Sequence, residues 1–376
     1  MTIHYLDNSA TTRVSENAAK KAYTLMTEEF ANPSSLHSMG FRASKELENA
    51  RDTVASALGA ESSEIIFTSG GSEANCLAIL GAAHAHKKRG GRIVTSALEH
   101  SSVYDTMLHL KEEGFDVVFL PTKAGGKIDI DAAFEAIDER TILVSLMHTN
   151  NEVGIINPVE ELKKIIKHKN SPALIHIDAV QAFGKTDIKV SRTGCDLLTV
   201  SSHKIHGPKG VGALYIRKGV RILPLTFGGK QERKLRPGTE ALPLIGAFGE
   251  AVKELNIKGT TEHVRALNTY LREQLSEIDG IVINSPEDAS PYILNFSTCA
   301  VRSETMLHHL AARDVFVSSG SACSKGGKSH VLKALSLPDE VADTAIRVSF
   351  SKHNTKDDCD ALIEGIRDGL STLARR

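Results

Sequence analysis

The sequence predicts an α/β protein, with a mostly parallel sheet of seven strands in a large domain and a smaller α+β domain after it. Two observations lead to this fold class. Between about residues 45 and 255, short and almost continuously apolar segments alternate with segments of helical periodicity. That alternation is typical of a parallel sheet covered by helices on both faces. After about residue 255 the apolar segments become shorter and less regular, which indicates a second, smaller unit.

The elements follow from the apolar periodicity in chain order. A helix is expected where apolar residues recur on one face, as Leu47, Ala50, Val54 and Leu58 do. The expected helices of the large domain are 46–58, 74–86, 102–113 and 159–168. Its expected strands are 65–67, 92–95, 116–120, 142–147, 174–178, 197–200 and 211–216. In the second unit we expect a helix at 266–278 and strands at 281–284, 292–296 and 346–350.

Composition excludes several classes of protein. The 376 residues carry 45 basic and 46 acidic side chains, a net charge of -1, so nothing favours direct nucleic-acid or membrane binding. No apolar run approaches the about 20 residues of a membrane-spanning helix, and the N-terminus lacks a signal-peptide layout. The five cysteines form no disulfide framework and no metal-site spacing. We therefore expect a cytoplasmic protein without a metal site.

A glycine-containing loop follows the strand at 65–67. The run 67–73, Phe-Thr-Ser-Gly-Gly-Ser-Glu, ends a strand and opens a helix. Backbone N–H groups at a helix start, approached closely across glycines, form an anion site. An ordinary capped helix start explains the same residues, so this loop alone decides nothing.

Two charged residues stand at the ends of later strands. Asp178 ends the strand at 174–178, where it is either a helix cap or the partner of a cationic cofactor nitrogen. Lys204 follows the strand at 197–200. A semi-buried lysine there has the lowered pKa that a Schiff-base amine needs, although most lysines are simply solvated. An anion cradle, a carboxylate and an amine together match the phosphate, ring nitrogen and aldehyde of pyridoxal phosphate (PLP).

Cys323 lies in the run 317–327, Val-Ser-Ser-Gly-Ser-Ala-Cys-Ser-Lys-Gly-Gly. Small and flexible neighbours suit a thiol that must be reached by a reactant, whereas buried structural cysteines usually stand among large apolar residues. Taken alone, the run also fits an incidental cysteine in a surface loop. Beside a PLP site, the thiol becomes a candidate nucleophile.

The chain resembles cysteine desulfurases of the NifS/IscS type, in the class V branch of the fold-type I PLP enzymes. The resemblance runs nearly end to end. The motifs that carry it are 5–12, 32–35 with His37, 67–73, 99–100, 150–154, 176–181, 201–210, 228–233, 236–239 and 318–323. It implies the fold of a fold-type I PLP-dependent transferase. Its expected units are an N-terminal arm at 1–14 that packs with the small domain, a PLP-binding large domain at 15–255, and a small domain at 256–376 that carries the cysteine loop.

The resemblance also implies residue roles. Lys204 binds the cofactor aldehyde and later moves the substrate Cα proton. Asp178 pairs with the ring nitrogen, and His100 stacks on the ring and handles protons. The other cofactor contacts implied are Gln181 at the phenolic oxygen, Asn151 at the cofactor and substrate, Gly71, Ser72, Ser201 and His203 at the phosphate, and Thr239 at the phosphate of the other subunit of a homodimer. Arg347 is implied to bind the substrate carboxylate as a planar fork.

The implied reaction converts L-cysteine to L-alanine and leaves a persulfide on Cys323. The sulfur then passes to an acceptor, either an iron–sulfur scaffold or a tRNA sulfurtransferase. The stretch from Cys323 to Val331 is a residue or two shorter than the family's usual length, Gly71-Ser72 replaces Ala-Thr, and Ser351 replaces a common glycine. A selenocysteine lyase, another class V aminotransferase and a non-catalytic binding platform remain as alternatives.

Overall fold

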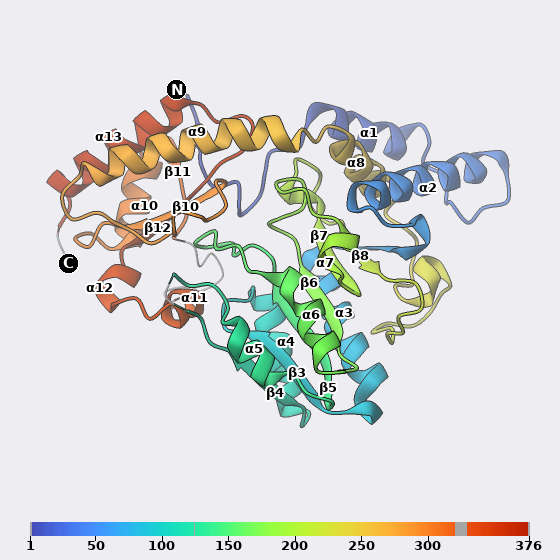
Figure 1. The fold of residues 1–376 in the computed structure, drawn as a ribbon. Helices are drawn as coiled ribbons and strands as arrows, with labels where there is room; N and C mark the ends of the chain where they lie inside the picture. Colours follow the sequence, from blue (N-terminus) through green and yellow to red (C-terminus); the bar gives the residue numbers. More distant parts are fainter. Residues whose placement is uncertain (1, 124, 320–328, 375–376) are drawn as a thin grey trace.

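The computed structural model describes residues 2–123, 125–319 and 329–374, and it has the predicted α/β architecture (Figure 1). A seven-stranded sheet has the order β2-β8-β7-β6-β5-β3-β4. Neighbours from β7 to β4 are parallel, whereas β8 is antiparallel to both β2 and β7. The strands are β2 (Ile65–Thr68), β3 (Arg92–Ser96), β4 (Asp116–Leu120), β5 (Thr141–Met147), β6 (Leu174–Asp178), β7 (Leu197–Ser201) and β8 (Gly212–Ile216).

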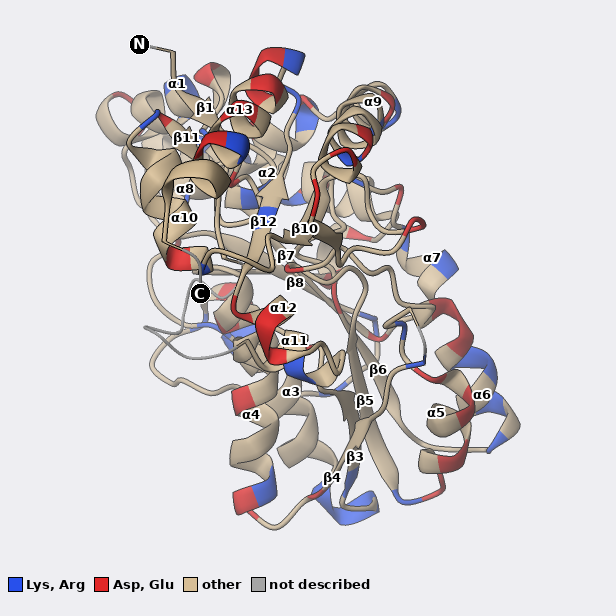
Figure 2. Cartoon of the chain, turned by 90° about the vertical axis from the view of Figure 1, so that its left-hand side faces the viewer, with Lys and Arg blue, Asp and Glu red and all other residues tan. Residues whose placement is uncertain are grey.

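Helices cover both faces of this sheet, as the edge-on view in Figure 2 shows. One face packs against α3 (Gly71–His86) and α4 (Ser101–Glu112), and the other against α5 (Ile130–Ala136) and α6 (Leu162–His168). Adjacent strand residues such as Ile93 and Val94 therefore enter different apolar cores. Burial on both faces explains why the strands are apolar without alternation.

Three further helices pack together beside β2: α1 (Glu16–Thr27), α2 (Ser38–Leu58) and α8 (Leu242–Lys253). Helix α2 begins at Ser38, well before the predicted residue 46. The His37 side chain caps it by accepting from Gly40 N at 3.2 Å. A side chain at Gly40 would meet Ser35 O at 2.2 Å, so the early turn requires glycine. The short helices are η1 (Ser62–Glu64), η2 (Lys87–Arg89), η3 (Val159–Glu161), α7 (Val190–Thr193), η4 (Ser202–Lys204) and η5 (Gln231–Lys234).

The C-terminal part has its own sheet and core. The antiparallel strands β9 (Val282–Ile283), β10 (Ile293–Ser297) and β12 (Ala345–Ser349) lie beside α9 (Ile257–Ser276), α10 (Ser303–Ala311) and α13 (Lys356–Thr372). Two short helices, α11 (His330–Ala334) and α12 (Asp339–Ala342), complete it. Helix α9 begins at Ile257, earlier than predicted, because the Asn256 side chain accepts from Gly259 N.

The N-terminal segment joins this second unit. Strand β1 (His4–Tyr5) pairs in parallel with β11 (Val315–Phe316), and Leu6 belongs to the C-terminal core. The domain limits predicted from the sequence stay predictions. No helix among the described residues is both long and apolar enough to cross a membrane.

A buried polar bridge joins the three central strands. His176 of β6 contacts Ser145 Oγ of β5 through Nδ1 at 2.8 Å and Thr199 Oγ1 of β7 through Nε2 at 3.1 Å. Burial lowers the pKa of His176 to about 3, so the imidazole is neutral in the folded protein. The bridge lies two residues before Asp178 and fixes the register of the strand that presents it.

Replacing His176 is expected to flatten the pH dependence of stability. In the wild type, unfolded His176 takes up a proton below its ordinary pKa of 6.5 while the folded protein does not, so stability falls as the pH drops toward 3. His176→Gln should reduce this slope by up to about 1.4 kcal/mol per pH unit. Urea unfolding at several pH values measures it. The control His308→Gln removes an exposed imidazole and should leave the slope unchanged; equal slopes in wild type and His176→Gln would contradict the prediction.

Candidate active site

A cavity of about 490 Å³ lies at the carboxyl ends of β5, β6 and β7, the usual ligand site of such sheets. The structure brings most of the predicted site residues together around it. Those that line it are Gly71, Ser72, His100, Asn151, Asp178, Gln181, Ser201, His203, Lys204 and Arg347. They come from helix starts, strand ends and β12, so one cavity collects residues as far apart in the sequence as Gly71 and Arg347.

Lys204 presents its amine to this cavity from the end of η4, directly after β7. Its Nζ donates to Ser9 O at 2.6 Å and to Ala10 O at 2.8 Å. The N-terminal segment therefore holds the amine in place through backbone carbonyls. An amine held at a cavity wall is suited to covalent attachment of a carbonyl compound.

Asp178 is the last residue of β6, and its side chain is almost completely buried. Asn75 Nδ2 donates to Oδ2 at 2.8 Å, and Val180 N donates to Oδ1 at 2.9 Å. Both roles predicted for Asp178, a cap and the partner of a cofactor nitrogen, are therefore compatible. The carboxylate accepts a backbone N–H and also faces the cavity. Its charge is suited to a cationic ring nitrogen.

His100 caps the start of α4 and also lines the cavity. Its Nδ1 accepts from Ser102 N at 3.1 Å, so in the neutral imidazole Nε2 carries the proton. Burial lowers the pKa of His100; Asp178 opposes this, and the positive charges of Lys204 and His330 add to it. The imidazole can therefore exchange a proton through Nε2.

The start of α3 forms one wall of the cavity. Gly71 and Ser72 lie there, and a Cβ on Gly71 would come within 2.8 Å of Val180 Cγ2. Opposite them, the buried Ser201 hydroxyl has no hydrogen-bond partner within the described residues. Burial and nearby lysines lower the pKa of His203 to about 4. A helix N-terminus, a glycine surface and an unsatisfied hydroxyl are suited to a phosphate group.

Arg347 of β12 enters the cavity from the C-terminal unit and is buried. Its Nη2 contacts Asp7 Oδ1 at 2.6 Å, and Nη1 donates to Asn151 O at 3.0 Å. The N-terminal segment and the turn after β5 therefore orient the guanidinium. A planar fork held in this way is suited to a carboxylate.

Two predicted residues are not part of this arrangement. Thr239 is exposed and does not line the cavity within one chain. Cys323 lies outside the described residues. Of the residues that flank its segment, Ser329 and His330 line the cavity, and Ser318 contacts Arg347, which also lines it. Ser318 pairs with Arg347 through two backbone hydrogen bonds, and Ser329 Oγ donates to Glu152 Oε2 at 2.6 Å. His330 contacts Glu99 O at 2.8 Å.

Sequence reasoning assigned no role to several cavity residues, although two of them, Ser9 and Glu99, lie in the motifs 5–12 and 99–100. Asn75, one turn after Gly71, is the one polar amide in the apolar stretch 74–83 of α3, and this was a readable signal because a buried amide needs a partner. Glu99 is fully buried, which raises its pKa to about 8, so it is largely protonated at neutral pH. Ser9 acts through its backbone carbonyl, and no side-chain pattern reveals such a role.

The residues present fit PLP. The phosphate has the start of α3 and the unsatisfied Ser201 hydroxyl, the ring nitrogen has Asp178, and the aldehyde has the Lys204 amine. His100 lies beside the same space.

Comparisons with known proteins show which proteins this chain resembles. The family model of the class-V aminotransferases matches residues 4–362. A cysteine desulfurase IscS from Dictyoglomus turgidum is 41% identical over 98% of this chain and 96% of its own length. A solved NifS-like protein superposes with a TM-score of 0.94 at 37% identity, covering 99% of this chain and all of its own. SspA, solved in complex with cysteine, has a TM-score of 0.83 at 34% identity, over 94% of this chain and all of its own.

Replacing Lys204 is expected to abolish covalent cofactor binding, because no other amine occupies its position at Ser9 and Ala10 among the described residues. Lys204→Ala incubated with PLP and then desalted should lose the visible absorption of the wild type. The matched control Lys209→Ala removes an exposed lysine from the same loop and should keep it. Retention of the visible band by Lys204→Ala would contradict the assignment.

Proposed function

The chain belongs to the class-V aminotransferase family and is a PLP-dependent cysteine desulfurase, and we propose that it passes the sulfur of L-cysteine to Cys323. One observation carries this proposal. The segment that contains Cys323 is flanked by Ser318 and Ser329, and both flanks contact residues that line the cavity holding Lys204 and Asp178. These contacts of the two flanks support the proposal that the thiol of this segment acts on substrate bound in that cavity.

The chain's own residues divide the work. Bound PLP withdraws electrons from the substrate Cα, which makes the Cα proton acidic and the Cβ–S bond breakable. Arg347 and Asn151 bind the substrate carboxylate and orient it. Lys204 takes and returns the Cα proton, and His100 exchanges a proton through Nε2. Asp178, held by Asn75 and Val180 N, keeps its charge against the ring nitrogen.

Sulfur transfer then balances without an external oxidant. The Cys323 thiolate attacks the substrate sulfur, an S–S bond forms, and the Cβ–S bond breaks. The bonding electrons of Cβ–S stay with the carbon, which takes up a proton to become the methyl group of alanine. The products are L-alanine and a persulfide on Cys323. Only the thiolate is a competent nucleophile here. The cysteine named in the SspA complex supports the choice of substrate.

Cys323→Ala should separate cofactor chemistry from sulfur transfer. The variant should retain PLP and bind L-cysteine, yet form no persulfide, so that sulfide release with a reductant falls by more than about a hundredfold. Mass spectrometry of the protein and alanine assays measure both steps. Cys299→Ala, which removes a partly buried thiol elsewhere, serves as the control. Full sulfur transfer by Cys323→Ala would refute the role of this thiol.

The acceptor of the sulfur belongs to the same proposal. An iron–sulfur scaffold protein and a tRNA sulfurtransferase both suit a persulfide donor. The stretch between Cys323 and Val331 is short for the family, so we propose a tRNA sulfurtransferase as an acceptor beside an iron–sulfur scaffold. We place this exchange in the cytoplasm, in line with the balanced charge and the scattered cysteines. The arm at 1–14 and the domains at 15–255 and 256–376 are the units we propose for the working enzyme.

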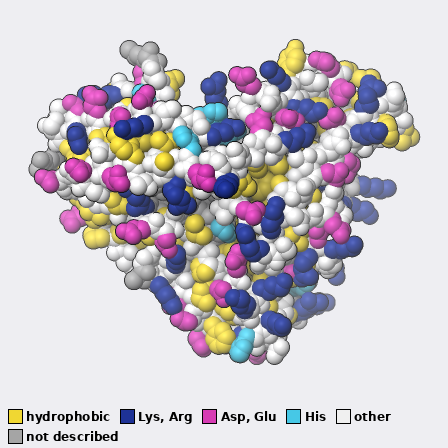
Figure 3. Space-filling model, turned by 45° about the horizontal axis from the view of Figure 1, so that its top comes forward, with side chains coloured by type: hydrophobic (Ala, Val, Ile, Leu, Met, Phe, Trp, Pro, Cys, Tyr) yellow, Lys and Arg dark blue, Asp and Glu magenta, His cyan; other side chains and the backbone are white. Residues whose placement is uncertain are grey.

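A homodimer completes the site in this proposal. Large apolar side chains are exposed at Leu36, Phe41 and Phe227, the last with 85% of its surface free. Residues 33 and 34 share a surface pocket with residues 230–233, so these segments adjoin near Thr239. Apolar side chains also reach the surface in Figure 3 at the end that carries α1 and α2. Exposed apolar groups gathered in this way mark protein interfaces. A second copy covering them would bring its Thr239 to the phosphate.

Charged substitutions in this surface are expected to produce monomers with weak PLP binding. Phe227→Asp combined with Phe41→Asp places two charges in the proposed interface, where an unpaired charge is costly. Sedimentation measures the mass, and titration of the apoenzyme measures PLP affinity. Val282→Asp alters an exposed apolar residue of β9 and should leave both unchanged. A dimer that persists with full PLP affinity would contradict the interface.

A further inference from the structure

Lys185 is a buried lysine that the chemistry described so far does not use. Only 6% of its surface is exposed, and within the described part of the chain no carboxylate forms an ion pair with it. Its amine donates instead to Gln181 Oε1 at 2.7 Å. Burying an amine without a counter-charge is costly, so this position calls for a role that a shorter or apolar side chain cannot fill.

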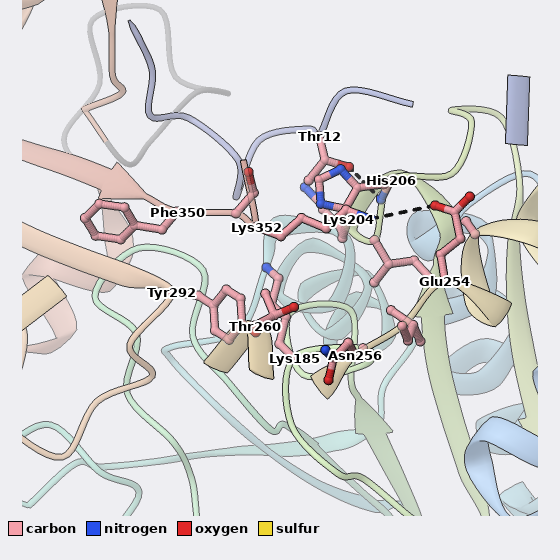
Figure 4. Close-up of a pocket in the computed structure, with 15 residues that line it drawn as sticks. Thr12, Lys185, Lys204, His206, Glu254, Asn256, Thr260, Tyr292, Phe350 and Lys352 are labelled. Carbon is pink, nitrogen blue, oxygen red and sulfur yellow. Dashed lines mark hydrogen bonds and ion pairs between the residues drawn. The ribbon is translucent and has the colours of Figure 1, made fainter. Parts of the chain in front are cut away.

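The surroundings hold Lys185 from both units. Its Nζ lies 5.6 Å from the centre of the Tyr292 ring, which precedes β10. Thr261 Oγ1 donates to the Lys185 backbone carbonyl at 3.0 Å and contacts the Tyr292 hydroxyl at 3.2 Å. Figure 4 shows Lys185 and Tyr292 at a small cavity that Lys204 and His206 also line. Burial lowers the pKa of Lys185 to about 7, and the charges of Lys204 and Arg347 add to the effect.

The hydrogen bonds on either side of Gln181 determine which way its amide faces. The Lys185 amine donates, so the atom that it meets must be the amide oxygen. At the other end, Gln181 Nε2 donates to Ser9 O at 3.0 Å, because a carbonyl only accepts. Both neighbours select the same orientation. Ser9 O also accepts from Lys204 Nζ at 2.6 Å, so the network runs from Lys185 through Gln181 and Ser9 to Lys204.

We propose that Lys185 is a positioning residue that turns the Gln181 amide so that its N–H groups face the cofactor site. An amide has two N–H donors. One is used by Ser9, and the second is left for an anionic oxygen in the cavity that Gln181 lines. Without the Lys185 amine, only the contact with Ser9 O orients the Gln181 amide, and the amide then also populates the reversed orientation, whose oxygen repels an anion. The inference rests on the proposed function only in taking the phenolic oxygen of PLP as that anion.

The test is a double-mutant cycle on PLP affinity, measured by titrating apoenzyme with PLP and following the visible band. Lys185→Met and Gln181→Met should each weaken binding about tenfold, the size expected for a charge-assisted hydrogen bond. The double variant should be no weaker than either single one, because both changes remove the same contact. Losses that multiply to about a hundredfold would overturn the proposal.

Two further variants separate positioning from a merely structural role. Lys189→Met removes another lysine of the same segment, whose amine donates to Ala57 O at 2.8 Å. It should affect the melting temperature of the apoenzyme at most and leave PLP affinity intact. Lys185→Arg keeps a donor toward Gln181 Oε1 and should retain PLP affinity. If Lys185→Met does not fold, Lys185→Arg still tests the proposal. A decrease in PLP affinity in Lys185→Arg equal to that in Gln181→Met would refute the proposal.

Failure of this proposal is distinct from failure of the proposed function. Wild type that binds PLP with the predicted coupling but releases no alanine from L-cysteine would refute desulfurase activity and support the positioning role. Alanine release together with independent effects of Lys185 and Gln181 would refute the positioning role alone.

Discussion

The backbone carbonyl of Ser9 is the contact on which the rest of the site depends. It accepts from Lys204 Nζ and from Gln181 Nε2, so one oxygen holds two groups that follow different strands. On one side of it, Asp7 pairs with Arg347 of the C-terminal unit. On the other side, the Thr12 N–H donates to the His203 carbonyl. The N-terminal segment therefore contacts both Arg347 and Lys204 and holds the two side chains at the same cavity.

Burial determines the protonation of the ionisable groups around this cavity. His203 and His100 have lowered pKa values because burial disfavours the imidazolium. Glu99 has a raised pKa for the corresponding reason. Asp178 is held as a hydrogen-bonded carboxylate by Asn75 and a backbone N–H. A site with neutral imidazoles and a localised carboxylate can bind a cationic ring and an anionic phosphate at opposite ends.

The comparisons narrow the functions that the sequence left open. Relatives named as cysteine desulfurases match nearly the whole chain, which favours this activity over a selenocysteine lyase, a general aminotransferase or a non-catalytic platform. The central strands and the seven-stranded sheet were predictable because burial on both faces leaves continuous apolar runs. The early starts of α2 and α9 were not, since His37 and Asn256 cap those helices from outside their apolar stripes.

The sequence by itself determined the fold class and the chemical groups of the site, because apolar periodicity and motifs such as 176–181 and 201–210 are local. Only the tertiary structure decided how those groups are held. The contacts of Lys185 with Gln181 and of Arg347 with Asp7 join positions whose sequence neighbours carry no sign of the pairing. Backbone acceptors such as Ser9 O cannot be predicted from a sequence pattern, since every residue has a carbonyl. Only the folded chain determines which carbonyl meets an amine.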